Sequence, residues 1–462
     1  MDSINLNVKI LEEYKMKLFN ELIRLAWKNN LDQVDTIPKK VLGENIHEEF
    51  DEVTIINLIR VIMGLNPTDE FDATLKDTLY EAMHLDEMNQ PIISIISQAC
   101  KYCNKSNKEE ECFVKEKHIN CNEKNICSSC GDCVSNCNLG AISDKIQFIP
   151  MIRLLKDEKC PVYAIVAPSF VGQFGKDVTP GKIRAALKKM GFEDMIEVAL
   201  AADMLTVKEA FEYCEHMKQN EDGYFITSCC CPVWISLIQN NFPEILKNVS
   251  PSVSPMIACG RAVKILDSNA KVVFIGPCIA KKKEATLYEI KDAVDFVLTF
   301  KELEEIFKAL DIDPSKQKEE DRVEASILGR VYARSGGVSE AIKISSQRIN
   351  KNIKFKSTVF QGAKECKEGL ERVINKELET TFIEGMGCIG GCVGGPRRIL
   401  SVENGTRYVE EYCKETQIET PFENLNVVQF LTMMGIKRVE LLGESEEKQV
   451  LKIFSRNITS NN

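Results

Sequence analysis

Three segments of the chain read Thr227-Ser-Cys-Cys-Cys-Pro-Val-Trp234, Gly276-Pro-Cys-Ile-Ala-Lys-Lys-Lys-Glu284 and Glu384-Gly-Met-Gly-Cys-Ile-Gly-Gly-Cys-Val-Gly-Gly-Pro396. Each follows an apolar, strand-like run: Tyr224-Phe-Ile, Val272-Val-Phe-Ile and Thr381-Phe-Ile, respectively. Ligands of open α/β sheets bind in the crevice beyond the carboxyl ends of the strands, so three such loops can converge on one site. Thiolates gathered there would hold a soft metal centre.

The composition is that of a globular protein with no nucleic-acid face. The chain has 462 residues, which suggests about two to four domains. Its net charge of -10, with no block of basic residues, argues against a nucleic-acid partner, because phosphate binding needs clustered Lys and Arg.

The cysteines point to metal binding in a reducing compartment. All 19 belong to a large chain in which many share metal-ligand spacings, so a disulfide scaffold is not expected. The first thirty residues have no apolar core of a signal peptide, and no run of about 20 apolar residues could span a bilayer. We expect a cytoplasmic protein with reduced thiols and no membrane partner.

Composition divides the chain into four parts. Residues 1–95 hold no cysteine and show helical spacing of apolar residues, which predicts a helical N-terminal region. Residues 96–150 are polar and rich in cysteine. Residues 151–440 alternate strand-like and amphipathic runs, which predicts an α/β domain with parallel sheets flanked by helices. Residues 441–462 should form a polar, helical C-terminal tail that frays.

A compact cysteine motif lies in the second part. Cys127, Cys130, Cys133 and Cys137 have the C-x2-C-x2-C-x3-C spacing that binds a cubane iron-sulfur cluster in bacterial ferredoxins. Zinc is the alternative, although zinc sites favour two separated pairs of ligands. Asn138 stands where ferredoxins usually have proline.

A looser quartet precedes this motif and consists of Cys100, Cys103, Cys112 and Cys121. In two-cluster ferredoxins the fourth cysteine of each motif ligates the other cluster. This rule pairs Cys137 with the first three and Cys121 with the second group. Residues 96–150 are therefore predicted to be ferredoxin-like with two [4Fe-4S] clusters, the alternative being that some thiols of the first quartet are free and buried.

The three loops supply four thiolates for another cubane: Cys231, Cys278, Cys388 and Cys392. Glycines in the third loop, Gly390, Gly391, Gly394 and Gly395, would let the backbone approach a bulky cluster. With these residues, the loops resemble the three signature motifs of the [FeFe]-hydrogenases, and the resemblance runs from about residue 96 to 436. It implies that the four cysteines hold the [4Fe-4S] half of an H-cluster and that Cys392 bridges to a diiron subsite with CO, CN and dithiolate ligands.

The resemblance carries over to four further residues around the diiron subsite. Lys281 matches a lysine that hydrogen-bonds a cyanide, a task suited to an ammonium. Met386 matches a methionine packed against the subsite. Pro168 and Ser169 resemble a strand-end segment whose backbone contacts the other cyanide.

A proton path should lead to a buried metal site. Glu209 and Glu212 lie one helical turn apart, and by resemblance they are the two relay glutamates, with Ser250 as the relay serine. Two glutamates on an amphipathic helix are more often a solvated face, but their distance in sequence from the first loop matches the family.

The first loop has three cysteines where typical hydrogenases have two. Alignment on Pro232 and Trp234 makes Cys231 the cluster ligand and Cys230 the proton donor, and it leaves Cys229 as an extra thiol. Alignment on Thr227 and Ser228 would shift both roles back by one residue. The first alignment is favoured because the proline fixes the backbone of the ligand.

Two further departures concern the neighbourhood of the diiron subsite. Gly276 stands where the family usually has methionine, and Gly395-Pro396 replaces the end of a glycine run. Together with the triple cysteine and the cysteine-free front, these features resemble the group B, or hydrogenase III, enzymes.

The expected activity is reversible conversion of two protons and two electrons to hydrogen. The resemblance implies ferredoxin as electron partner and a maturation machinery for the H-cluster. Two alternatives are a hydrogenase-like iron-sulfur assembly protein without a diiron subsite and a hydrogen sensor.

The remaining cysteines and histidines are expected to be structural. Cys160, Cys214, Cys259, Cys366 and Cys413 are isolated in sequence and more often core residues than ligands. His118 lies among the cluster cysteines and is expected at the surface.

Overall fold

The computed structural model describes residues 10–43, 49–70, 73–85, 87–103, 112–124, 126–157, 160–220, 223–228, 230–320, 322–444 and 446–459. Clustering of contacts divides it into two compact units. Unit 1 comprises residues 1–159 and 301–313, and unit 2 comprises residues 160–300 and 314–462. Among the described helices, none is both long and apolar enough to cross a membrane.

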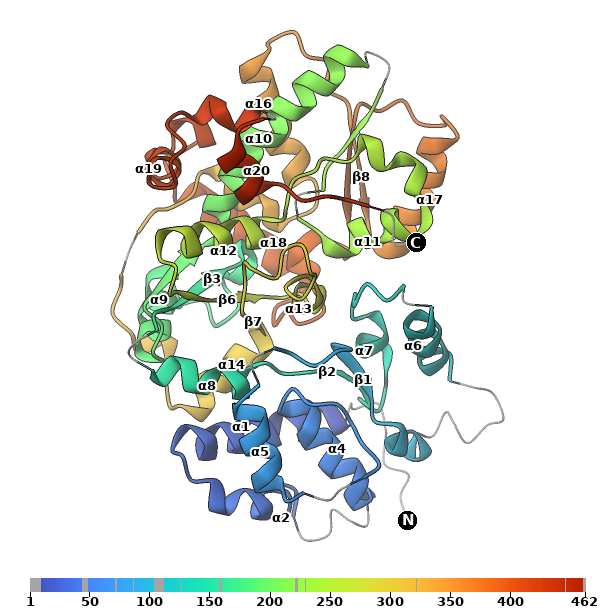
Figure 1. Ribbon diagram of the computed structural model, residues 1–462, viewed down its shortest axis with the longest axis vertical. Helices are drawn as coiled ribbons and strands as arrows, with labels where there is room; N and C mark the ends of the chain where they lie inside the picture. The colour runs from blue at the N-terminus through green and yellow to red at the C-terminus, as the bar shows by residue number, and fades with distance from the viewer. Residues whose placement is uncertain are drawn as a thin grey trace. The chain divides into compact units, whose positions relative to one another are not determined.

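Unit 1 combines a helical part with a small antiparallel hairpin (Figure 1). Its helices are α1 (Ile10–Trp27), η1 (Leu31–Thr36), α2 (Ile37–Leu42), α4 (Glu52–Ile62), α5 (Leu75–Met83), η2 (Ser97–Tyr102), α6 (Phe113–Glu123), α7 (Asp132–Asn136), α8 (Phe148–Lys156) and most of α14 (Phe300–Ala309). Strand β1 (Ile93–Ile95) pairs with β2 (Ile142–Asp144), so the cysteine-rich residues lie between the two strands of one hairpin.

A buried lysine fastens the first helix of unit 1 to this hairpin. Lys15 on α1 is 2% exposed, and its ammonium donates to the Ser143 hydroxyl and the Asp144 carbonyl, each at 2.7 Å. Gly140 has a φ of +85°, and a Cβ there would lie 2.8 Å from the Glu12 backbone nitrogen. The helical part and the hairpin therefore pack as one body.

Unit 2 contains two parallel sheets. The first has the strand order β4-β3-β6-β7, built from β3 (Val162–Val166), β4 (Asp194–Glu197), β6 (Lys271–Gly276) and β7 (Phe296–Thr299). The second has the order β5-β9-β8, built from β5 (Phe225–Ile226), β8 (Ser357–Gln361) and β9 (Phe382–Met386). The predicted α/β domain with parallel sheets flanked by helices is confirmed.

The helices of unit 2 connect and cover these sheets. They are α9 (Pro180–Lys189), α10 (Val198–Gln219), α11 (Pro232–Asn241), α12 (Pro255–Leu266), α13 (Ala280–Glu284), α15 (Ile327–Arg330), α16 (Gly337–Ile349), α17 (Ala363–Ile374), α18 (Val402–Lys414), α19 (Leu425–Met433) and α20 (Lys448–Phe454). Short 3-10 turns join them: η3 (Pro168–Phe170), η4 (Pro243–Asn248), η5 (Pro314–Lys316), η6 (Val331–Ala333), η7 (Gly391–Gly394), η8 (Pro421–Glu423) and η9 (Val439–Gly443).

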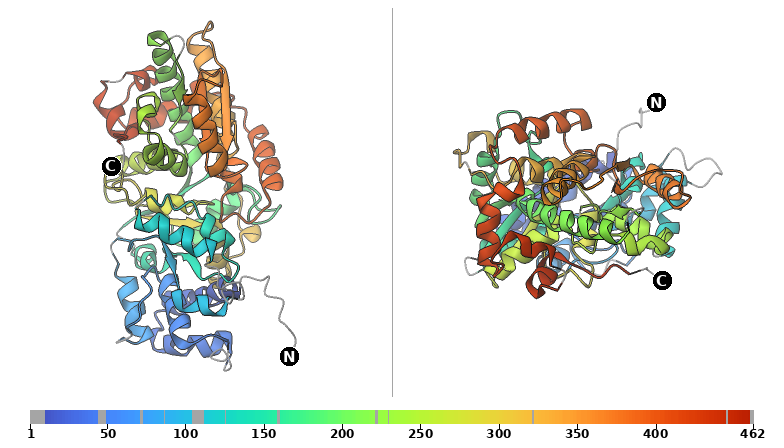
Figure 2. Two further views of the ribbon diagram at one scale, coloured as in Figure 1. Left: turned by 90° about the vertical axis from the view of Figure 1, so that its right-hand side faces the viewer. Right: turned by 90° about the horizontal axis from the view of Figure 1, so that it is seen from above.

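Helices lie on both faces of the second sheet, as Figures 1 and 2 show: α11 and α17 on one face, α10 and α16 on the other. The core on the α11 side contains Trp234, Ile238, Leu370 and Ile383, all buried. Helix α10 also leads from β4 of the first sheet to β5 of the second, so one helix spaces the two sheets.

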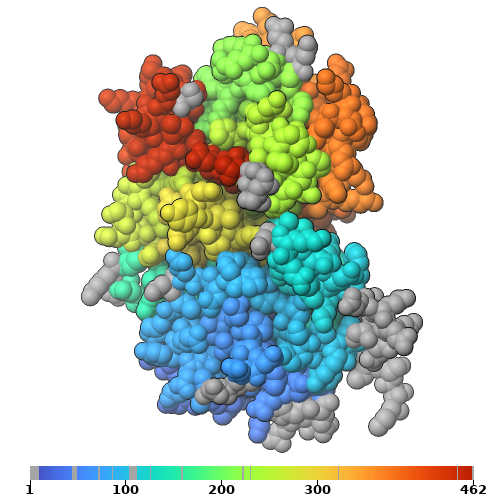
Figure 3. Space-filling model, turned by 45° about the vertical axis from the view of Figure 1, so that its right-hand side comes forward, coloured from blue at the N-terminus to red at the C-terminus, as the bar shows by residue number. Residues whose placement is uncertain are grey.

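The C-terminal segment differs from the fraying polar tail that the sequence predicts. Its helix α20 buries Val450, Ile453 and Phe454 and packs on α12; the dark red segment lies on the surface of unit 2 in Figure 3. The backbone nitrogen of Val253 donates to the Phe454 carbonyl at 2.9 Å. The helix has four apolar residues, Val450, Leu451, Ile453 and Phe454, which is too short a run to show a clear helical period, and the surface that it packs on is distant along the chain.

Candidate functional site

The predicted metal ligands of unit 2 lie at the carboxyl ends of neighbouring strands. Cys278 follows β6, beside β3, and in this sheet the chain order reverses between β3 and β6, where ligands bind in open α/β sheets. Cys231 follows β5, and Cys388 and Cys392 follow β9, which is the neighbour of β5 in the second sheet. Both sheets therefore contribute thiols.

Cys231 is held at the start of a helix. It is the residue before Pro232, the first residue of α11, and the Gly387 backbone nitrogen donates to its sulfur at 3.3 Å. The Trp234 indole nitrogen donates to the Thr227 carbonyl at 2.9 Å, which fixes the loop between strand and helix. A helix N-terminus favours a thiolate.

The thiols of the three loops are close enough to repel one another when ionised. Burial, followed by the thiol of Cys231, raises the pKa of Cys278 to about 12, and Lys281 opposes the rise. Burial and Cys231 likewise raise the pKa of Cys392 to about 11. A bound metal must displace these protons, because only thiolates are ligands.

The glycines of the third loop are required by the chain itself. A Cβ on Gly394 would lie 1.8 Å from the Ile389 carbonyl oxygen, and one on Gly395 would lie 2.7 Å from the Pro277 carbonyl oxygen. Gly390 and Gly391 have φ values of +86° and +81°. From the sequence we expect these glycines to make room for a cluster. In the structure, the atoms that occupy the space beside them are protein atoms. The contact of Gly395 with Pro277 brings the second and third loops together.

Lys281 is buried and paired. Its ammonium donates to the Glu284 carboxylate at 2.6 Å, and both side chains are at most 8% exposed. Burial works to lower the pKa of Lys281, but Glu284 and the thiols of Cys278 and Cys392 together leave it raised. The chain therefore holds a permanent cation beside two of the candidate ligands.

Cys230 and the residues predicted to surround the diiron subsite lie near the loop that bears Lys281 or near the loop that bears Cys231. The Cys230 thiol lies 3.6 Å from the Met386 sulfur, and Met386 is buried. Ser169 and Pro168 are buried in η3, and the Ser169 hydroxyl has no hydrogen-bond partner among the residues that the structure describes. An unsatisfied buried hydroxyl is costly, so it favours a ligand at this position. The extra thiol, Cys229, lies outside the described residues.

The two glutamates predicted to form a proton relay are buried or partly buried. Glu209 is fully buried, and it accepts a hydrogen bond from the Thr227 hydroxyl at 2.7 Å and from the Ser228 backbone nitrogen at 3.4 Å. Glu212 accepts one from the Ser250 hydroxyl at 2.8 Å. The inner carboxylate is thus fixed to the loop that bears Cys230, and the outer one is fixed to Ser250.

Three residues that bond predicted site residues were missed from the sequence: Lys208, Ser252 and Glu284. Lys208 is 3% exposed and bonds Glu212, and its ammonium also donates to the Ser252 hydroxyl at 2.9 Å. Glu284 pairs with Lys281 as described above. The spacings Lys208 to Glu212 and Lys281 to Glu284 were readable signals, because side chains three or four residues apart meet on a helix.

The absence of methionine at position 276 has a local explanation. A Cβ on Gly276 would lie 2.6 Å from the ring of Phe274 and 3.2 Å from the Ala167 Cβ. Phe274 is 3% exposed, so its ring occupies the space that a longer side chain at position 276 would need.

In unit 1 the eight cluster cysteines form two neighbourhoods. Burial raises the pKa of Cys100, and after the opposing effect of Lys115 the thiols of Cys137, Cys112 and Cys103 raise it further. In the other group, burial and then the thiols of Cys130 and Cys127 raise the pKa of Cys133 to about 12, and Cys121 feels the thiol of Cys127. These neighbours are the ones that the crossed ferredoxin pairing calls for, and the ligand assignment itself stays a prediction.

The expectation of a surface position for His118 is wrong. The side chain is 4% exposed, its Nδ1 lies 3.7 Å from the Cys133 sulfur, and its Nε2 lies 2.9 Å from the Asn122 amide. Burial lowers the pKa of His118. Helix α6 turns this face toward the cysteines, a contact that the polar sequence of α6 does not reveal.

Of the five cysteines expected in the core, four are buried and Cys160 is not. Cys214, Cys259, Cys366 and Cys413 are buried, whereas Cys160 is partly exposed. Burial and then the thiol of Cys231 raise the pKa of Cys366 to about 12, and the Cys366 thiol donates to the Met386 carbonyl at 3.4 Å. Cys366 thus packs against Met386, the residue at which the third loop leaves β9.

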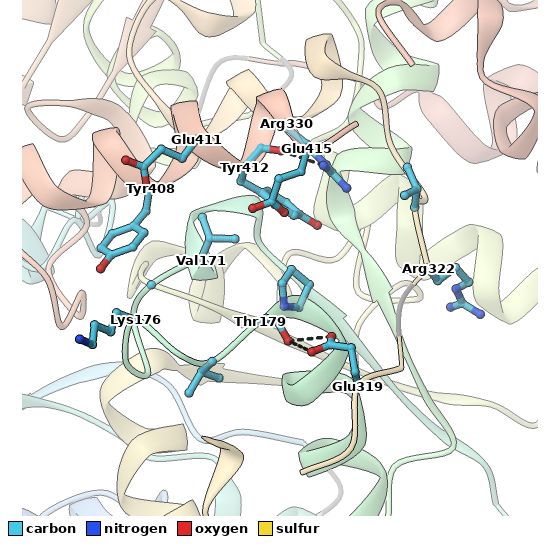
Figure 4. Close-up of a pocket in the computed structure, with 14 residues that line it drawn as sticks. Val171, Lys176, Thr179, Glu319, Arg322, Arg330, Tyr408, Glu411, Tyr412 and Glu415 are labelled. Atoms are coloured by element: carbon cyan, nitrogen blue, oxygen red, sulfur yellow. Dashed lines mark hydrogen bonds between the residues drawn. The ribbon is translucent and has the colours of Figure 1, made fainter. Parts of the chain in front are cut away.

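A pocket of about 590 Å³ in unit 2 is lined by none of the predicted site residues (Figure 4). The Thr179 hydroxyl donates to the Glu319 carboxylate there, at 2.6–2.7 Å, and the Arg330 guanidinium lies 3.6 Å from the centre of the Tyr412 ring. Its cations and carboxylates are balanced, so its lining shows no preference for one ligand charge.

The donor set of the thiol loops fits an iron-sulfur centre. Within the described ranges, no three His, Cys, Asp or Glu side chains come close enough to share a single metal ion. A cubane places its thiolates on separate irons and holds them further apart. Partly buried thiols from both sheets, the Lys281 cation and the Ser169 hydroxyl, which no described residue bonds, fit a large anionic cluster.

Fold and site together define an iron-sulfur protein with a parallel α/β core. Residues 160–396 match the model of the family described as "Iron only hydrogenase large subunit, C-terminal domain", and the chain belongs to this family.

Curated relatives agree with this assignment. Iron hydrogenase 1 of Clostridium pasteurianum is 30% identical over 308 residues, which are 56% of this chain and 53% of that protein. The NADP-reducing hydrogenase subunit HndD of Solidesulfovibrio fructosivorans is 28% identical over 323 residues, 58% of this chain and 55% of that protein. The chain thus spans about half the length of these two relatives.

The solved structures share the fold. The apo [FeFe]-hydrogenase HydA1 from Chlamydomonas reinhardtii superposes with a TM-score of 0.54 at 18% identity, over 66% of this chain and 96% of that one.

Proposed function

We propose that the protein is a cytoplasmic [FeFe]-hydrogenase of the group B, or hydrogenase III, type. It would interconvert two protons and two electrons with molecular hydrogen. The observation that carries the proposal is the meeting of thiols from two sheets, Cys231 and Cys278, beside the buried cation of Lys281. A cation beside thiols favours the thiolate form that binds metals, because Lys281 opposes the effect of burial on the pKa of Cys278.

Four cysteines would hold the cluster: Cys231, Cys278, Cys388 and Cys392. The H-cluster, when bound, supplies the redox chemistry that forms or splits hydrogen. Lys281 would donate a hydrogen bond to an anionic cluster ligand, with Glu284 fixing its position. Met386 and the η3 segment with Pro168 and Ser169 would close the cavity around the cluster and exclude water.

Cys230 would exchange the proton with the site, and Glu209, Ser250 and Glu212 would carry it. The buried position of Glu209 and the exposed edge of Glu212, which is 21% exposed, support a direction from inside to outside. Acid-base groups placed in this way contribute about 10²–10⁴-fold to a rate.

Electrons would reach the site through two [4Fe-4S] clusters bound by the eight cysteines between Cys100 and Cys137. Ferredoxin is the proposed electron partner, and a maturation machinery would insert the diiron subsite.

The test is an infrared spectrum of anaerobically matured protein, before and after hydrogen is admitted. Carbonyl and cyanide stretching bands that shift under hydrogen are expected. The variant Cys278→Ala, prepared in the same way, should show no such bands. Protein that carries its iron but lacks the bands would instead favour an iron-sulfur assembly protein, and bands with negligible turnover would favour a sensor.

A further inference from the structure

An ion pair between a buried lysine and a partly exposed glutamate lies at the outer end of the proposed proton relay. Lys208 and Glu212 lie four residues apart on α10, with side chains 3% and 21% exposed. The Lys208 ammonium bonds Glu212 Oε1 and also donates to the Ser252 hydroxyl at 2.9 Å. One cation therefore holds both a relay carboxylate and a hydroxyl beside it.

The other oxygen of the same carboxylate faces two hydroxyls. Glu212 Oε2 accepts from the Ser250 hydroxyl at 2.8 Å and from the Ser252 hydroxyl at 3.4 Å. The Ser252 backbone nitrogen donates to the Ser250 oxygen at 3.1 Å. These contacts aim Ser250 and Glu212 at each other, with Oε1 reserved for the lysine.

Helix stability does not explain this pair. Lysine four residues before glutamate is the weaker of the two orders on a helix, and burial makes any ion pair costly because both charges lose water. An apolar pair would fill the same space at a lower cost. Such a pair is better explained by what the charge does to Glu212.

Neighbouring segments hold the acceptor side rigidly. The Ser228 hydroxyl donates to the Ser252 carbonyl at 2.9 Å, which links this segment to the cysteine loop. Ser252 also forms a backbone bridge with Ser455, just after α20. The C-terminal segment and the first loop therefore fix the hydroxyl that Lys208 bonds.

We propose that Lys208 is a positioning residue of the relay: its ammonium bonds Glu212 Oε1 and so holds Oε2 aimed at Ser250, where Glu212 accepts protons that leave the site. This rests on the proposed function. In the step, the Ser250 hydroxyl proton passes to Glu212 Oε2, and Ser250 regains a proton from Glu209, the group before it in the proposed relay. The lysine keeps its own proton throughout. Hydrogen oxidation, which exports protons, should depend on Lys208 more than hydrogen evolution does.

The test compares matured Lys208→Met and Lys208→Arg with the wild-type protein. In Lys208→Met, the carboxylate loses the contact that holds Oε1, so difference infrared spectra should show a shifted carboxylate stretching band. Lys208→Met/Glu212→Gln should lack this band, which assigns it to Glu212. Hydrogen oxidation in Lys208→Met should fall by about tenfold, which is less than the roughly 10²–10⁴-fold that an acid-base group itself contributes, because Lys208 acts only through Glu212. Lys208→Arg should keep both the wild-type carboxylate band and most of the rate.

Two controls make the result specific. Lys218→Met removes an exposed pair with Glu215 on the same helix and should change neither readout. If the methionine variant does not fold, Lys208→Gln, which keeps a donor and loses the charge, is measured against Lys208→Arg with the same expectations.

The outcomes separate the two proposals. A charge-removing variant without a shifted carboxylate band, or with an unchanged oxidation rate, overturns the role of Lys208. Wild-type protein that carries the diiron subsite but turns over no hydrogen in either direction overturns the proposed function, whatever the infrared band shows.

Discussion

The substitution Gly395→Ala tests whether the second and third cysteine loops support each other. An added Cβ would lie 2.7 Å from the Pro277 carbonyl oxygen and 2.8 Å from the Pro277 Cβ. Gly395 has φ -55° and ψ 152°, which alanine adopts without strain, so the cost is steric alone. Because Pro277 precedes Cys278 and Gly395 lies three residues after Cys392, the methyl group should push two ligands apart.

The expected cost follows from these contacts. Overpacking in a rigid core costs about 1–3 kcal/mol, and the lower entropy of the unfolded alanine variant offsets about 0.4–1 kcal/mol of it. A net loss of about 1–2 kcal/mol corresponds to a melting temperature lower by roughly 2–8 °C in a large domain. Thermal unfolding and the iron bound after anaerobic reconstitution are measured together, and both should decrease.

The matched control is Gly405→Ala on α18. There the nearest atom to an added Cβ is the Val393 Cβ at 3.2 Å, and alanine is the better helix former by about 1 kcal/mol. This variant should bind iron as the wild type does. A Gly395→Ala protein with full iron and an unchanged melting temperature would refute the reasoning that these loops meet through Gly395.

Three further predictions concern other residues. Cys230→Ala should keep its iron and lose about 10²–10⁴-fold in dye reduction under hydrogen, whereas Cys231→Ala should lose the iron of the unit 2 cubane; near wild-type activity of Cys230→Ala would contradict the assignment. Cys121→Ala and Cys137→Ala should each remove a different accessory cluster, so their low-temperature electron paramagnetic resonance spectra should differ; identical spectra would contradict the crossed pairing. Burial lowers the pKa of Lys145 from 10.5 to about 8, so the unfolded chain binds more protons between these values, and the free energy of unfolding should rise by on the order of 3 kcal/mol as pH increases from 8 to 10.5. Denaturant titrations should show that rise in the wild type, and an equal rise in Lys145→Met would exclude Lys145 as its source.

The sequence predicts best what depends on local spacing. The βα alternation after residue 151 predicts the parallel sheets, because strand and helix periods are local patterns. The three loops could be placed at strand ends for the same reason. The sequence does not show that two sheets, rather than one, supply these loops, since strand order depends on contacts between distant segments.

Buried polar contacts were harder to predict from the sequence than the strands and helices. Lys15 and Lys208 read as ordinary helix-surface lysines, yet both are buried against partners that lie 44 or more positions away in the chain. His118 and the α20 helix follow the same rule, because their burial depends on surfaces that other segments provide. Composition alone favours exposure for such residues.

Isotope exchange tests the proposed hydrogenase activity most directly, because it needs no electron partner. Anaerobically matured wild-type protein is incubated with deuterium gas in ordinary water, and the headspace is followed by mass spectrometry. If the protein is a hydrogenase, HD and then H2 should be released, the exchange should be lost in Cys278→Ala, and it should be slower in Cys230→Ala. Matured protein that shows the carbonyl and cyanide bands but releases no HD would contradict the proposed activity.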